Sequence, residues 1–147
     1  MQRKGFFDFA LLDYIVAKNN PVEPFYFDST ICLLTQCIEK MLKGFLELET
    51  GESPIRTHKL TTLSRELSLI DGFEFLKIER GNLAILQDSY FDRRYPSEDY
   101  YVLDLEDFNN LTSSAYHIID TLKSKLPNGI IFDLPDDSVR CSRMNLL

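Results

Sequence analysis

The chain has 147 residues and a net charge of -7, which arises from 23 acidic and 16 basic side chains. This length fits one domain, and 44% hydrophobic residues supply enough apolar surface for a single core. The acidic balance opposes attraction of the whole surface to nucleic acid or anionic membranes, so any nucleic-acid contact must be local. No stretch is long and uncharged enough to span a bilayer.

The three cysteines, Cys32, Cys37 and Cys141, are odd in number and lack C-x-x-C spacing. They therefore favour small buried residues over a disulfide framework or a zinc site. The first twenty residues contain basic side chains and then an apolar run, but Asp8 and Asp13 interrupt it and no cleavage site follows. We interpret this stretch as a helix, not a signal peptide, and expect a cytoplasmic protein.

The N-terminal half predicts two helices. The first covers about residues 6–18 and ends at the Asn-Asn-Pro sequence of residues 19–21. Its expected inward residues are Phe7, Leu11, Tyr14 and Ile15. The second follows Pro24 and runs to about Thr50, with Gly51 as its C-terminal stop. Its expected buried stripe recurs in steps of four and three at Phe27, Ile31, Leu34, Ile38, Met41, Phe45 and Leu48.

Thr57 is the expected N-cap of a third helix. Its apolar face comprises Leu60, Leu63, Leu67 and Ile70. Residues 73–95 are harder to assign, because Gly81 breaks the pattern. A helical stripe appears only behind Asn82, at Leu83, Leu86 and Tyr90, and Pro96 closes it.

A last long helix is expected from an Asp104 cap to Pro127. Its inner face comprises Leu105, Phe108, Leu111, Ala115, Ile118, Leu122 and Leu126. The prediction is an all-α, antiparallel up-and-down bundle of about five helices over residues 1–126. Residues 127–147 lack a helical period and form an irregular tail. Its Ile130-Ile131-Phe132 triplet is an exposed apolar patch unless it packs on the bundle or a partner.

Polar residues on the second helix suggest where chemistry occurs. Gln36, Lys40 and Lys43 are separated by four and three residues, so they form a polar stripe able to meet an anion or a second subunit.

Another cationic group is expected at the start of the third helix. Arg56, His58 and Lys59 lie where unpaired N–H groups and the helix dipole favour a phosphate. The alternative is that Thr57 caps the helix, His58 bonds a neighbouring helix end and both cations are solvated.

Arg93, Arg94 and Tyr95 form a third group at a helix end. Arginine suits phosphate or carboxylate, and tyrosine suits a stacked base. The alternative is a cationic C-terminus that complements its own helix dipole. The second histidine, His117, is interpreted as a boundary residue. The acidic clusters are not accompanied by the other ligand residues of a metal site, and no phosphate-binding loop or zinc-binding helix motif is present. We therefore expect neither a metal nor a cofactor.

Three short motifs occur in order: Q-x-x-E-K-x-L-K at residues 36–43, T-H-x-L at 57–60 and R-Y-P at 94–96. With the final amphipathic helix, they make the chain resemble the HEPN domains, named for nucleotide binding in higher eukaryotes and prokaryotes, over nearly its whole length to Leu126. The resemblance implies a helical bundle that is frequently a homodimer, associates with nucleotides or RNA and often pairs with a small nucleotidyltransferase in toxin-antitoxin systems. It also implies a common groove for Lys40, Lys43, His58, Arg93, Arg94 and Tyr95.

The sequence departs from the ribonucleases of that superfamily, in which a histidine follows an arginine after four to six residues. Here Arg94 is followed at those places by Asp99, Tyr100 and Tyr101. The usual agent for acid-base work at the RNA 2′-hydroxyl is therefore missing.

Three hypotheses follow. The leading one is a non-catalytic module that binds a nucleotide or an RNA phosphate. The second is a metal-independent ribonuclease that uses Arg94 with Tyr100 or His58. The third is a structural scaffold whose polar stripe and C-terminal tail make dimer or partner contacts.

Overall fold

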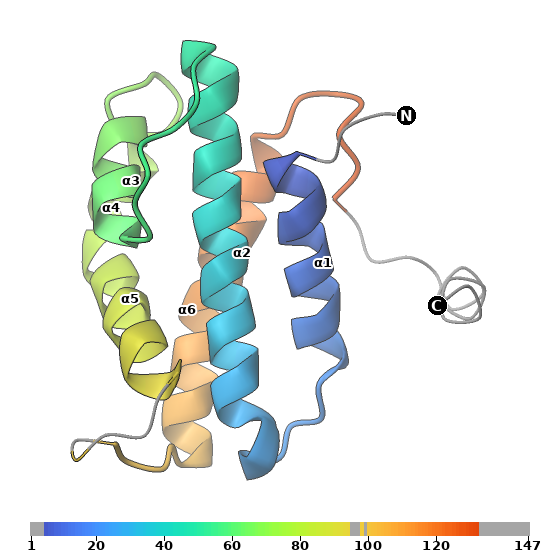
Figure 1. The fold of residues 1–147 in the computed structure, drawn as a ribbon, viewed down its shortest axis with the longest axis vertical. Coiled ribbons are helices and arrows are strands. Elements are labelled where there is room, and N and C mark those ends of the chain that lie inside the picture. The colour runs from blue at the N-terminus through green and yellow to red at the C-terminus, as the bar shows by residue number, and fades with distance from the viewer. Residues whose placement is uncertain (1–4, 95–97, 99, 133–147) are drawn as a thin grey trace.

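The computed structural model describes residues 5–94, 98 and 100–132, and within them the fold is entirely helical (Figure 1). The helices are α1 (Phe6–Asn19), α2 (Pro24–Thr50), α3 (Leu60–Leu67), α4 (Phe75–Ile78), α5 (Arg80–Arg94) and α6 (Leu105–Ser124). Helices α1 and α2 run antiparallel, as do α2 and α5 and also α5 and α6, and α2 packs against α1, α3, α5 and α6. The predicted all-α bundle is confirmed, with the short α4 in addition to the five expected helices.

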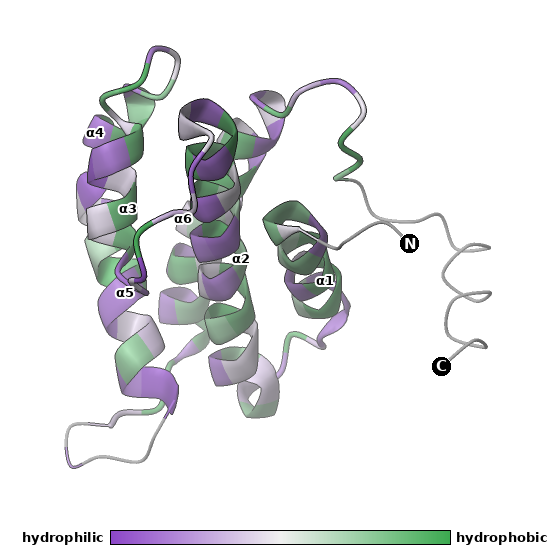
Figure 2. Cartoon of the chain, turned by 45° about the horizontal axis from the view of Figure 1, so that its top comes forward, coloured by the Kyte–Doolittle hydropathy of each residue, from purple (hydrophilic) through white to green (hydrophobic). Residues whose placement is uncertain are grey.

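Helix α2 begins and ends where the sequence predicts. Pro24 occupies its first turn, and Gly51 follows its end in the left-handed conformation, with φ 72°. Six of the seven predicted stripe residues are buried, but Leu48 is exposed. A strict seven-residue repeat drifts about 20° per heptad on a straight helix, so three heptads carry the last position out of the core. Figure 2 shows hydrophobic and hydrophilic segments alternating around this helix.

The start of α3 differs from the prediction. Thr57 does not cap it, because the helix begins at Leu60 and the Thr57 hydroxyl accepts a bond from the Lys59 amide instead. A side chain from α5 bonds the first turn of α3: Gln87 Oε1 accepts bonds from the Thr61 amide and hydroxyl at 3.1 and 3.0 Å. This partner lies 26 residues away, where no local capping pattern reveals it.

The segment between α3 and α6 contains two helices. Helix α3 ends at Leu67, three residues before Ile70, which stays half-buried against the core. The sequence predicted that Gly81 breaks a helix, but it lies in the first turn of α5. The break comes before it, between the end of α4 at Ile78 and the start of α5 at Arg80. The predicted residues Leu83, Leu86 and Tyr90 are buried.

The cap of α6 is confirmed, since Asp104 Oδ1 accepts a hydrogen bond from the Asp107 amide at 2.7 Å. Leu105 was expected inside but is exposed, because it occupies the first helical position, beyond the core. In the tail, Phe132 is buried with its ring 5.5 Å from that of Tyr14, whereas Ile131 is exposed. Residues 133–147 of the expected tail lie outside the described part of the chain.

Helices α1 and α2 approach closely at Gly44. A Cβ atom there would lie 2.7 Å from Cζ of Phe7, whose ring packs edge-on against Phe45. Gly81, in contrast, has no atom within 4 Å of such a Cβ. The two glycines therefore form a matched pair that separates helix propensity from packing.

We predict that Gly44→Ala lowers the free energy of unfolding by about 1–3 kcal/mol, because the methyl group overpacks the contact with Phe7. Gly81→Ala should raise it by about 0.4–1 kcal/mol, because alanine reduces the freedom of the unfolded chain without a clash. Urea denaturation followed by circular dichroism measures both changes. Stabilisation by both variants would show that the α1–α2 contact does not require a glycine.

Candidate functional site

One row of residues on α2 organises the polar contacts of the bundle. Its members are Asp28, Cys32, Gln36, Glu39 and Lys43, and we call them the α2 polar row. Their spacings of four, four, three and four residues place them on one side of the helix. Asp28 and Gln36 contact side chains of α5, and Glu39 contacts the segment that precedes α3. The row is therefore the seam where α2 meets these two parts of the chain.

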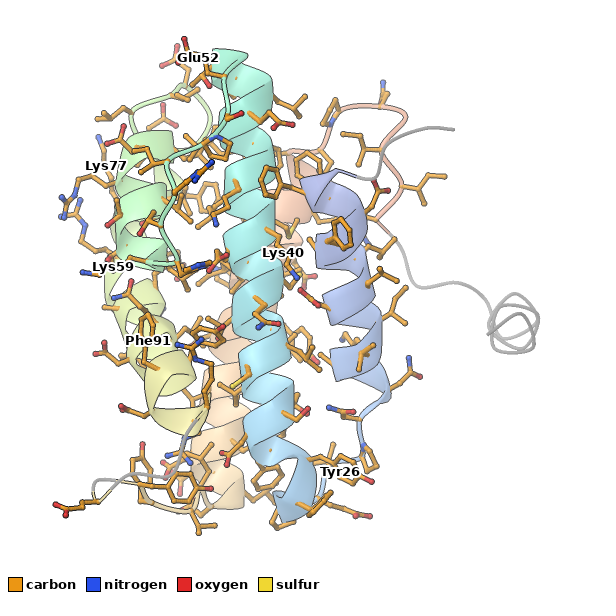
Figure 3. All side chains as sticks on the ribbon, viewed as in Figure 1. Tyr26, Lys40, Glu52, Lys59, Lys77 and Phe91 are labelled. Carbon is orange, nitrogen blue, oxygen red and sulfur yellow. The ribbon has the colours of Figure 1, made fainter. Side chains whose placement is uncertain are left out.

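The predicted stripe of Gln36, Lys40 and Lys43 is divided between two seams. Lys40 forms an ion pair with Asp13 of α1, with 2.5 Å between Nζ and Oδ2. Figure 3 shows Lys40 on the α1 side of α2, whereas Lys59 and Phe91 lie on the other side of that helix. A helical turn takes about 3.6 residues, so a residue three or four positions along the chain is not directly above the first. Lys40 therefore lies at the edge of the row, on the side where α1 carries the Asp13 carboxylate.

Glu39 contacts two basic side chains, His58 and Lys43. Nδ1 of His58 lies 3.2 Å from both carboxylate oxygens, and Nζ of Lys43 lies 3.2 Å from Oε2. The carboxylate is largely buried, but the His58 side chain is 75% exposed. A buried carboxylate that engages Nδ1 orients the ring and leaves Nε2 available to solvent. His58 precedes α3 and is not inside its first turn as predicted, so its position depends on Glu39.

Arg94 of α5 lies near Gln36 of the row, because both side chains bond the Tyr90 hydroxyl. Its Nη1 donates to the hydroxyl of Tyr90 at 3.2 Å, and Gln36 Nε2 donates to the same oxygen at 3.2 Å. The guanidinium also lies over the rings of Tyr90 and Phe91, at 4.3 and 5.1 Å from their centroids. The Arg94 residue is nevertheless exposed. Its planar group is thus held in place beside α2 while part of it faces solvent.

Arg93 has a different environment, although it is the adjacent residue. Its side chain is 1% exposed, and its Nη1 donates to Asp28 Oδ1 at 3.1 Å and to the Tyr101 carbonyl at 2.6 Å. The rings of Tyr100 and Tyr101 flank the guanidinium, and the Tyr100 hydroxyl donates to Asp28 at 2.6 Å. Arg93 therefore ties α2, α5 and the segment before α6 together.

Asp28 is a residue that the sequence interpretation missed. It lies 65 residues from Arg93 and 72 from Tyr100, so no local motif links them. The remaining predicted cations, Arg56 and Lys59, are exposed on the segment between α2 and α3. The Thr61 amide, in the first turn of α3, already donates a hydrogen bond to Gln87. An anion that binds near Lys59 would therefore be held mainly by side chains and not by that N–H group. The predicted Tyr95 lies outside the described residues.

The Cys32 thiol in the row and the Tyr100 phenol beside it are poor nucleophiles or bases at neutral pH. Burial, followed by the nearby Asp28 carboxylate, raises the pKa of Cys32 to about 11. The hydrogen bond to Asp28 is the main cause that raises the pKa of Tyr100. Both groups stay protonated near pH 7, because a raised pKa favours the neutral form of an acid.

Other polar places in the described chain fit an anion less well. A hollow of about 200 Å³ at the end of α2 is lined in part by Glu52 and Glu66, whose carboxylates oppose phosphate. His117 is exposed and contacts Glu79 at 3.3 Å. Among the residues described, no group of His, Cys, Asp and Glu could hold a metal ion, and no helix is long and apolar enough to cross a membrane.

We predict that Arg93→Met lowers the free energy of unfolding by about 2 kcal/mol, because it leaves Asp28 and the Tyr101 carbonyl without their buried partner. The cost is below that of a fully buried pair, since the Asp28 side chain is 33% exposed. The matched variant Arg94→Met should cost less than about 1 kcal/mol, because this residue is exposed. Equal losses in urea denaturation would contradict the division between the two arginines.

Comparison with known protein families gives one match. Residues 7–125 match the family model described as the HEPN domain. The matched region runs from the second residue of α1 to the end of α6, and it contains the α2 polar row, His58 and Arg94. Separate comparisons of the chain with curated proteins and with solved structures found no match.

Proposed function

We propose that this chain, which belongs to the HEPN domain family, binds a nucleotide or an RNA phosphate beside the α2 polar row. Membership in this family supports a module that works with nucleotides or RNA. The observation that carries the proposal is the placement of two cationic groups along one row: His58 and Lys43 at Glu39, and Arg94 beside Gln36. Gln36 and Glu39 are three residues apart, about 4.5 Å along the helix axis.

The cations differ in how they would meet a phosphate. Arg94 offers a planar fork that the hydroxyl and ring of Tyr90 already orient, so little freedom is lost when an anion binds. His58 offers Nε2, because Glu39 engages its Nδ1. Lys43 adds a point charge, but its side chain is only 12% exposed. Arg94 and His58 are therefore the proposed direct contacts, and Lys43 strengthens the local field.

The other predicted site residues take different roles in the proposal. Arg56 and Lys59 are exposed on the segment that carries His58, so they supply additional positive charge at the rim. Arg93 and Lys40 are engaged by Asp28 and Asp13, so they support the scaffold. Binding of phosphate by either of them would require an internal ion pair to open.

The proposed module is non-catalytic. The histidine of the ribonuclease pattern is absent, and the Tyr100 hydroxyl that stands near its place donates to Asp28. The proposal includes a homodimer, a nucleotidyltransferase-domain partner of the toxin-antitoxin type and a cytoplasmic location, on the strength of the family and of the cysteine pattern. It invokes neither a metal nor a cofactor.

We predict that Arg94→Glu weakens the binding of AMP or of a short single-stranded RNA by at least about tenfold in isothermal titration calorimetry. The reason is that a charge-assisted contact becomes a repulsion, worth about 1.4 kcal/mol or more. Binding by the wild type should also weaken as salt rises.

The matched control is Lys77→Glu, which makes a lysine-to-glutamate charge change at an exposed position of α4, away from the row. It should leave binding nearly unchanged. If Arg94→Glu and Lys77→Glu weaken binding equally, net charge governs binding and the assigned site is wrong. If the wild type binds neither ligand, the proposed function is wrong.

We predict that His58→Ala weakens the binding of a short single-stranded RNA by about three- to tenfold in isothermal titration calorimetry, because the proposed hydrogen bond through Nε2 is lost. Glu39 and Lys43, which contact the ring or its partner, remain in the variant. Unchanged affinity in the variant would exclude His58 from the site.

A further inference from the structure

Phe91 is an aromatic side chain that the proposed phosphate contacts do not use. It follows Tyr90 on α5, is 39% exposed, and its ring centroid lies 5.1 Å from the guanidinium carbon of Arg94. Its ring meets that of Tyr90 edge-on at 5.6 Å. The core therefore covers only part of the ring, and Arg94 lies beside it.

The position of Phe91 around α5 directs it toward the segment that carries His58 and Lys59. Gln87 lies one turn earlier on the same side of α5, and it bonds Thr61, two residues after Lys59. Figure 3 shows Phe91 and Lys59 on the same side of the bundle, with Lys59 closer to the α4 end. The exposed ring thus lies beside Arg94, on the side of α5 where Gln87 bonds the first turn of α3.

We propose that Phe91 is the stacking platform for the base of a nucleotide unit whose phosphate is held by Arg94. This inference rests on the proposed function and deepens it, because it assigns a base-binding residue to the phosphate site. A flat apolar ring next to an oriented guanidinium suits a ligand that carries a planar base and a phosphate together. Inorganic phosphate would use only the Arg94 half of this site.

The charges around Phe91 favour one nucleotide unit over a long strand. Asp88 and Asp92 are exposed on α5, three residues before and one residue after Phe91. They lie on the side of Phe91 that faces away from Arg94, since successive residues are turned by about 100° around the helix. Their carboxylates repel a second phosphate on that side, and the whole chain carries a net charge of -7. A mononucleotide, or one unit of a short single strand, is the ligand that fits.

The test compares AMP with ribose 5-phosphate, which has the phosphate but lacks the base, by isothermal titration calorimetry. The wild type should bind AMP about tenfold more tightly, because stacking of one base contributes only to AMP. Phe91→Leu should reduce AMP affinity to that of ribose 5-phosphate. Ribose 5-phosphate binding should change by less than about twofold, because the hydroxyl and ring of Tyr90 still hold Arg94. Phe25→Leu is the matched control, since Phe25 is exposed in the first turn of α2 and contacts only the neighbouring Tyr26 ring among the ring contacts described.

A second variant reports the stacking directly. The chain contains no tryptophan, so Phe91→Trp introduces a single indole. AMP should quench its fluorescence, and ribose 5-phosphate should not. Hexaadenylate shows whether the nucleotide unit is a free nucleotide or part of a strand. Equal affinity for AMP and for hexaadenylate supports a free nucleotide. Tighter and strongly salt-dependent binding of hexaadenylate supports a unit of a strand.

The outcomes separate this inference from the function on which it rests. If the wild type binds AMP and ribose 5-phosphate equally, the stacking role is wrong and the phosphate site stands. If Phe91→Leu weakens both ligands to the same degree, the ring only supports Arg94 and the inference is also wrong. If no phosphate ligand binds, the inference and the proposed function both fail. Circular dichroism confirms that each variant is folded.

Discussion

Helix α2 must satisfy two opposing demands along 27 residues, and the rest of the structure depends on how it does so. Its apolar stripe is buried against α1, α3, α5 and α6, and a polar row runs along the same helix at the seam with α5. Buried polar groups are costly unless they are paired. The row therefore requires partners from elsewhere in the chain: Arg93 for Asp28, Tyr90 for Gln36, and His58 for Glu39. Lys43, a member of the row, also pairs with Glu39. These pairs fix α5 and the segment before α3 against α2.

Much of the fold could be predicted from the sequence because its signals are local. Pro24, Gly51 and the Asp104 cap determine helix ends through their own backbone or nearest neighbours. The errors arose where a distant residue decides. The start of α3 is bonded by Gln87 and not by Thr57, so the predicted helix began too early. Leu48 left the core because a heptad pattern drifts on a straight helix.

The candidate site could be predicted less well for the same reason. The cation-bearing segments were found from residue type and from the family resemblance, but the carboxylates that hold them were not. Asp13, Asp28 and Glu39 each contact a basic side chain that lies at least 19 residues away in the chain: Lys40, Arg93 and His58, respectively. A sequence pattern that counts charges cannot tell an engaged cation from one that faces solvent. Only the packing of α1 and α5 against α2 makes that distinction.

The adjacent residues Arg93 and Arg94 have different environments, and only Arg94 is a direct ligand contact in the proposed function. Consecutive helical residues are turned by about 100°, so two arginines in sequence cannot share an environment at a helix that packs on one side. Arg93 is directed into the seam and is bonded to Asp28 and Tyr101, whereas Arg94 is directed along the surface, over Tyr90 and Phe91. The buried arginine holds the end of α5 in place. Because that end is held, the second guanidinium keeps a defined position beside the α2 polar row, and such preorganisation would favour the proposed contact with a phosphate.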